Sequence, residues 1–184
     1  MRPKSSSRAA LLALTTAAWM GVSGLALAQT ASEAHEIPQS QTAEHADNLV
    51  HLAALAKHPG EVGAIAARAV ALFKQHDARE AEYIMPPLSL LPYLADGKIT
   101  PDMQWAVVMA DRVKADRELI FTEHTKMIEV LNELQFAGQK AHDEEAVDFA
   151  KSAAVDALND VEILEPMAVV IGDILRAKLG SPAH

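Results

Sequence analysis

The sequence contains no cysteine. Neither a disulfide nor a thiolate metal site can therefore form, and any bound metal must be held by histidine and carboxylate side chains. Aromatic residues make up only 4% of the chain, and its apolar residues recur at helical spacing instead of alternating as they do in strands. The composition and its periodicity predict an all-α protein.

Only one long apolar run is present, Ala9–Ala28 near the start of the chain. It follows three basic residues and ends in Ala26-Leu27-Ala28, the small-x-small pattern that a signal peptidase cleaves. We expect residues 1–28 to be a signal peptide cleaved after Ala28, which predicts a periplasmic or secreted protein; an uncleaved anchor is the alternative. Because no second such run follows, no stable membrane insertion is expected after cleavage.

Basic residues are in the minority, with 16 Lys and Arg against 25 Asp and Glu. Three of the basic residues and none of the acidic ones lie in the predicted signal peptide, so cleavage would leave a net charge of about −12. A protein this acidic repels nucleic acid and anionic membrane surfaces, which excludes both as expected partners. The residues that remain suit one domain with a sizeable core.

Proline, glycine and capping residues divide the rest of the chain into four main predicted helices. We expect a flexible leader over residues 29–40 and a loop with a short helical turn before Thr100-Pro101-Asp102, a typical helix start. The predicted helices span about residues 41–57, 59–85, 100–139 and 143–178. Long helices with short links predict an up-and-down four-helix bundle over residues 41–180.

The two halves of the chain are imperfect copies of each other. Residues 44–55 match residues 123–134, which aligns His45 with His124, and residues 76–86 match residues 156–166. The offsets agree, at 79 and 80 residues. A duplicated helix pair is therefore predicted, and it aligns the residue types that bind metals.

Each predicted helix interrupts its core-facing row with a histidine or a carboxylate. The row on the fourth helix runs through Phe149, Ala153, Asp156, Asp160, Ile163, Met167 and Val170. A buried carboxylate costs several kcal/mol unless it is neutralised, and Arg117 is the one basic residue close to these rows. We therefore predict a metal site formed by His45, His76, Glu80, His124, Asp156 and Asp160.

The acidic residues beside these candidates have a simpler interpretation. Glu44, Glu123 and Glu162 are expected to be solvated charges on the outer faces of their helices. The alternative is that they orient the imidazoles of the metal ligands through hydrogen bonds.

At these residues the chain resembles the hemerythrin-like (HHE cation-binding) family, over roughly residues 41–178. The resemblance is carried by His76-x-x-x-Glu80 running into Pro86, by Glu123-His124 before an apolar helix, and by a similar end to the fourth helix. The chain is similar in particular to secreted bacterial members in which Pro-Pro-Leu-x-Leu-Leu, here residues 86–91, follows the first motif.

The resemblance implies a four-helix bundle with a non-haem di-iron centre, bridged by Glu80 and Asp160 and completed by three histidines. Asp156 stands where the family usually has a histidine, and Ile120 where many members have a second one. A ligand set richer in carboxylate stabilises ferric iron and disfavours reversible oxygen carriage, and manganese, zinc, a single metal or no metal are alternatives.

Three functions agree with these residues. The first is a binding protein that takes up iron and meets oxygen, nitric oxide or peroxide there. The second is an enzyme that turns over ferrous iron, peroxide or nitric oxide at the same centre. The third is a metal-free helical interaction protein. No substrate-pocket signature and no acid–base pair outside the proposed ligands is recognisable in the sequence, which favours binding over catalysis; the oligomeric state is left open.

Overall fold

The computed structural model describes residues 35–180, and these are almost entirely helical with no strand among them. The prediction of an all-α protein is therefore confirmed for this part of the chain. The predicted signal peptide, residues 1–28, and residues 29–34 of the predicted leader lie outside the described residues. Within the described part, no helix combines the length and the apolar character needed to cross a membrane.

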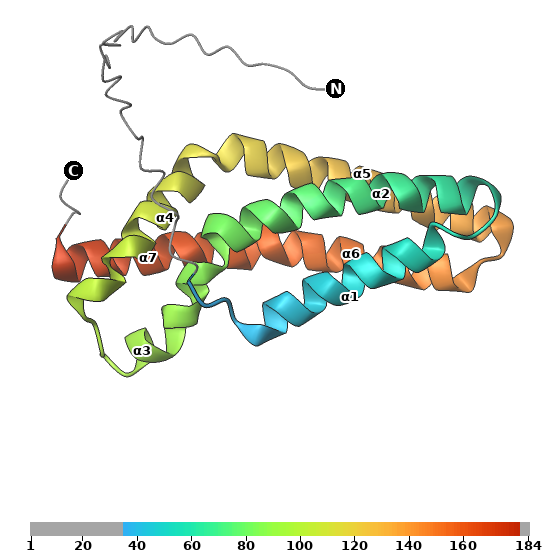
Figure 1. Ribbon diagram of the computed structural model, residues 1–184. Coiled ribbons are helices and arrows are strands. Elements are labelled where there is room, and N and C mark those ends of the chain that lie inside the picture. The colour runs from blue at the N-terminus through green and yellow to red at the C-terminus, as the bar shows by residue number, and fades with distance from the viewer. Residues whose placement is uncertain (1–34, 181–184) are drawn as a thin grey trace, which may run out of the picture. The chain divides into compact units, whose positions relative to one another are not determined.

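The first two helices follow the prediction closely and differ from it at their ends. Helix α1 spans Gln39–Leu55 and begins two residues earlier than expected, so the leader that precedes it is shorter. Helix α2 spans Gly60–Arg79 and begins directly after Pro59, whose extended backbone and missing N–H suit a helix start. The figures show these two helices side by side (Figure 1).

The second predicted helix does not remain α-helical to its end. After Arg79 it widens into a π-helical turn, η1, over Glu80–Ile84, where the Met85 amide bonds the Glu80 carbonyl at 2.8 Å. The prolines that follow stop the α-helix as predicted, because they lack a donor for the helical ladder. The chain continues as a 3-10 turn, η2 (Pro86–Leu90), and a short helix, α3 (Leu91–Ala95), where a helical turn was expected.

The third and fourth predicted helices are each interrupted once. The third begins with a 3-10 turn and bends at Asp116, and the fourth contains a second π-helical turn. Their elements are η3 (Pro101–Gln104), α4 (Trp105–Ala115), α5 (Arg117–Ala141), α6 (Glu144–Asn159), η4 (Asp160–Leu164) and α7 (Glu165–Leu179).

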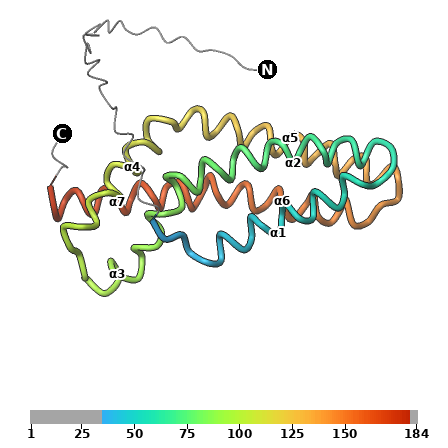
Figure 2. Tube along the Cα trace, in the orientation of Figure 1, coloured from blue at the N-terminus to red at the C-terminus, as the bar shows by residue number. Residues whose placement is uncertain are grey.

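The long helices pack in two connected groups along the described chain (Figure 2). In one group α1 packs on α2, α2 on α5 and α5 on α6, around a core that includes Leu52, Phe73, Leu131 and Phe149. In the other group α4 packs on α7 beside η2. The π-helical turns lie where one group passes into the other, because η4 joins α6 to α7 and η1 contacts α4.

Helices α4 and α7 approach each other closely through small residues. A Cβ atom added to Gly172 on α7 would lie only 2.2 Å from the Cβ atom of Ala110 on α4. Only glycine therefore fits at this position without moving one helix away from the other.

Candidate metal centre

Four of the predicted ligands meet in the interior. One ligand atom from each of His76, Glu80, His124 and Asp160 lies within 4.8 Å of the other three. All four side chains are buried, and Glu80 is completely inaccessible to solvent. Atoms bonded at about 2.1 Å to one tetrahedral ion lie about 3.4 Å apart, so side-chain shifts of up to about an ångström would close the group around a metal. The group can hold a metal ion.

The π-helical turns place the two carboxylates of this group. Glu80 begins η1 and Asp160 begins η4, and the internal repeat aligns these two residues, which are 80 positions apart. A π-helical turn inserts one residue into an α-helix, which rotates the residues after it relative to those before it, and such turns are frequent at functional sites. Both halves of the repeat therefore carry the same irregularity at the same ligand position.

Most of the atoms that could bind a metal in this group are buried without hydrogen-bond partners. Both ring nitrogens of His76, both carboxylate oxygens of Glu80 and Nε2 of His124 have no partner. Nε2 of His76 lies 3.2 Å from Oε1 of Glu80, yet the two do not align as a hydrogen bond. Buried polar atoms without partners are rare and costly, and their concentration at one point is what a site for a cation requires.

The tautomer of His124 is fixed by the backbone. Its Nδ1 atom lies 3.0 Å from the carbonyl oxygen of Ile120, which can only accept, so Nδ1–H donates. The unpartnered Nε2 atom of His124 is then unprotonated and presents a lone pair to the cluster. The ring meets that of His76 edge to face, with centroids 4.3 Å apart.

Glu80 connects this group to His45. Its Oε1 atom faces His76, and its Oε2 atom lies 3.3 Å from Nε2 of His45. The other nitrogen of His45, Nδ1, lies 3.3 Å from Oδ1 of Asp77. Each oxygen of one carboxylate thus faces a different imidazole.

Asp156 lies outside the four-residue group but close to it. Together with Glu44, His45 and Asp160 it lines a small internal cavity of about 10 Å³, the size of about one water molecule. The structure therefore brings four of the six predicted ligands together, places the fifth, His45, against Glu80, and places the sixth at the edge of the adjoining cavity.

Burial shifts the acid–base equilibria of the cluster toward neutral forms. It raises the pKa of Glu80 and of Asp160, and nearby carboxylates raise both further. It lowers the pKa of His45 and of His124 to about 4, with the charge of His76 adding to the effect. A bound cation would reverse the effect on the acids, because it stabilises carboxylates in their ionised form.

Glu123 is not the solvated charge that we expected. It is half-buried and receives two hydrogen bonds from Arg79, at 2.8 and 2.9 Å, and one from Gln75 at 3.1 Å. Its Oε2 atom lies 3.9 Å from Nδ1 of His76. The guanidinium group thus holds a carboxylate behind a ligand imidazole, at a distance longer than the hydrogen bond that the alternative interpretation requires. Glu162, in contrast, is exposed as predicted.

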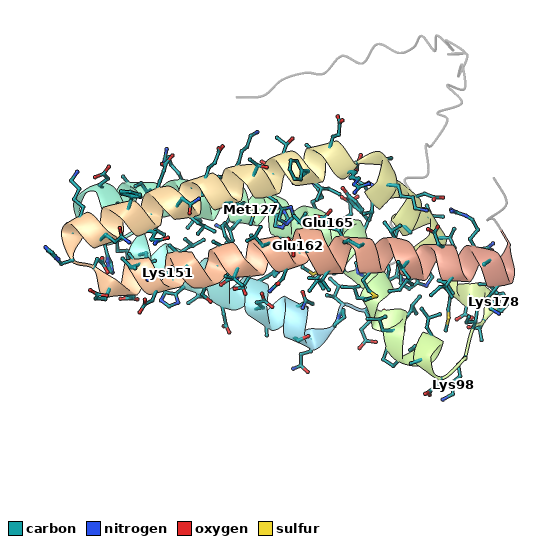
Figure 3. The ribbon with its side chains drawn as sticks, turned by 180° about the vertical axis from the view of Figure 1, so that it is seen from behind. Lys98, Met127, Lys151, Glu162, Glu165 and Lys178 are labelled. Carbon is teal, nitrogen blue, oxygen red and sulfur yellow. The ribbon has the colours of Figure 1, made fainter. Side chains whose placement is uncertain are left out.

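Sequence reasoning missed Glu165, which lies against the cluster. Its carboxylate is buried at 7% exposure, and its Oε1 atom lies 3.4 Å from Nδ1 of His124 (Figure 3). Burial raises its pKa to about 7, and the charge of Glu80 adds to this. The π-helical turn explains the error, since the straight α-helical row predicted Ile163 and Val170 to be buried and they are 53% and 48% exposed.

Comparison with protein-family models, with curated proteins and with solved structures found no match to this chain.

Proposed function

We propose that this chain is a metal-binding protein of the hemerythrin-like kind, in which α1, α2, α5 and α6 act as an up-and-down four-helix bundle around a non-haem di-iron centre. The proposed ligands are the six predicted ones. One observation carries the proposal: five donor atoms of His76, Glu80 and His124 are buried without hydrogen-bond partners beside Asp160. Imidazole and carboxylate together suit iron, and also manganese or zinc.

The position of Glu80 favours two ions over one. Its two oxygens face two different imidazoles, those of His76 and His45, at 3.2 and 3.3 Å, an arrangement that would suit a carboxylate shared by two metals. His76 and His124 with Asp160 would then serve one ion. His45 and Asp156, which line the small cavity with Asp160, would serve the other.

The size of that cavity favours a very small ligand. About 10 Å³ is the size of about one water molecule, so this space favours a ligand of very few atoms and excludes an organic substrate. Iron would supply the redox chemistry, and the protein would exclude other ligands by size. We therefore propose binding or sensing of oxygen, nitric oxide or peroxide in a periplasmic or secreted protein, instead of turnover of a larger substrate.

The test is metal loading under anaerobic conditions, followed by iron analysis and visible spectroscopy on admission of oxygen. We expect close to two iron ions per chain and an oxygen-dependent band that His124→Ala abolishes. The matched variants lie on one π-helical turn: Asp160→Asn should lower the iron content, whereas Glu162→Gln, which alters an exposed carboxylate, should not. Iron below about 0.3 per chain in the unmodified protein, or equal loss in both variants, would remove the proposal.

A further inference from the structure

A second cavity lies on the other side of Glu165 from the metal centre. Its volume is about 610 Å³, and it is formed by the end of α4, the start of α5, and η4 with α7. Its walls are mostly apolar and include Val113, Phe121, Pro166 and Val170. None of the six proposed metal ligands lines it. Pockets of a few hundred cubic ångströms with apolar walls and few polar groups are typical of small-molecule sites.

The polar groups of this cavity are of opposite charge. Glu165 lines it and is more than nine-tenths buried; its Oε1 atom faces His124 at 3.4 Å without a hydrogen bond, and its Oε2 atom has no hydrogen-bond partner among residues 35–180. Arg117 also lines it and acts electrostatically on Glu165. Lys114 pairs with Asp173 at 2.5 Å, whereas Arg117 makes no such pair among residues 35–180. An acceptor and a donor therefore face the same apolar space.

We infer that this cavity binds a small phenol, whose hydroxyl donates to Glu165 and accepts from Arg117 while its ring lies against Phe121 and the valines. A carboxylate in the same place would meet Arg117 but would set a second anion beside Glu165. An ammonium group would meet Glu165 but would face the cations. A neutral hydroxyl matches both, and the exposed ring of Phe121, 62% accessible, offers an aromatic contact. The inference does not depend on a metal.

The test uses three two-ring probes of similar shape with the purified protein at pH 8, above the pKa of about 7 of Glu165. A chelator is present, so that the outcome is independent of the proposed metal function. The probes are 1-naphthol, naphthalene and 1-naphthoate, and binding is measured by fluorescence titration. We expect 1-naphthol to bind about tenfold more tightly than naphthalene, as for one added hydrogen bond to a charged group, and 1-naphthoate to bind no better than naphthalene. Amide chemical-shift changes should map to residues 113–121 and 161–170.

Matched variants locate the site. Val170→Arg fills the cavity from an exposed position and should weaken 1-naphthol binding at least tenfold, whereas Val108→Arg, on an equally exposed part of α4 outside the cavity, should not change it. Glu165→Leu should lower the affinity for 1-naphthol to that for naphthalene. If that variant does not fold, Arg117→Ala, at the exposed rim of the cavity, replaces it and should remove most of the difference in affinity between these two probes. Equal binding of the three probes, a preference for 1-naphthoate, no binding at all, or no effect of Val170→Arg would overturn the inference.

Discussion

Replacement of Glu80 by glutamine should stabilise the metal-free protein while it removes metal binding. In the absence of a cation, the Glu80 side chain is fully buried and neither of its oxygens accepts a hydrogen bond. Its pKa is raised by burial and by the charges of Glu44 and Glu123. The folded chain must therefore keep this carboxyl protonated near neutral pH, although the unfolded chain would ionise it.

The magnitude follows from that difference. At about pH 6.3, two units above the unfolded pKa of about 4.3, the need to keep this carboxyl protonated lowers the free energy of unfolding by about 2.7 kcal/mol. Glutamine removes this protonation cost, but its amide is also poorly hydrogen-bonded, which costs about 1 kcal/mol. A net gain of roughly 1–2 kcal/mol remains, which raises the melting temperature by about 2–8 °C in a chain of this size. The gain should grow with pH between 5 and 8, because the carboxyl of the unfolded state is already ionised there while that of the folded state keeps its proton.

The assay is thermal unfolding in a chelator at pH 5 and pH 8, paired with metal titration of the same samples. Glu82→Gln is the control, since Glu82 lies on the same π-helical turn but is exposed and paired with Arg112. It should change neither the pH dependence nor the metal content. Destabilisation of metal-free Glu80→Gln at pH 8, or undiminished metal binding by it, would refute the reasoning.

Three further expectations concern other parts of the molecule. Burial raises the pKa of Asp77 and of Glu165 to about 7, so the folded state holds protons that the unfolded state releases. The melting temperature of the metal-free protein should therefore fall as pH rises from 6.5 to 8, and a rise would contradict this. Saturating metal should reverse the trend, because the metal displaces these protons. Glu123→Gln should weaken metal binding roughly tenfold through loss of the carboxylate behind the imidazole, in a metal titration where the exposed Glu129→Gln on the same helix is unchanged. Gly172→Ala should lower the free energy of unfolding in urea by about 1–3 kcal/mol despite alanine's better helix propensity, and stabilisation would show that α4 and α7 can separate without cost.

The internal repeat and the cost of buried charge were sufficient to find most of the cluster from sequence. His76, Glu80, His124 and Asp160 lie at repeat positions that hold a histidine or a carboxylate in both halves, and they lie on core-facing rows. Both signals depend only on residue type and spacing. The prolines at 86 and 87 were equally informative, since they end the second helix by removing donors.

The remaining features depend on backbone geometry that spacing does not reveal. A helical wheel at 100° per residue predicts the buried residues of this helix correctly as far as Asp160 but not beyond it, because η4 adds a residue to the turn. As a result Glu165 is buried and Ile163 is exposed. The pairing of Arg79 with Glu123 joins two helices, and a wheel drawn for each helix separately contains no information about such a contact.

The cluster takes residues from both halves of the repeat: His76 and Glu80 from the first, His124 and Asp160 from the second. An ion held by all four would act as a cross-link between segments that are up to 84 positions apart in the chain. Loops of that length lose much entropy when their ends are joined. In a chain without cysteine, metal bound only by the folded state would add its binding free energy to the stability of the fold, and its release would remove this link between the two halves.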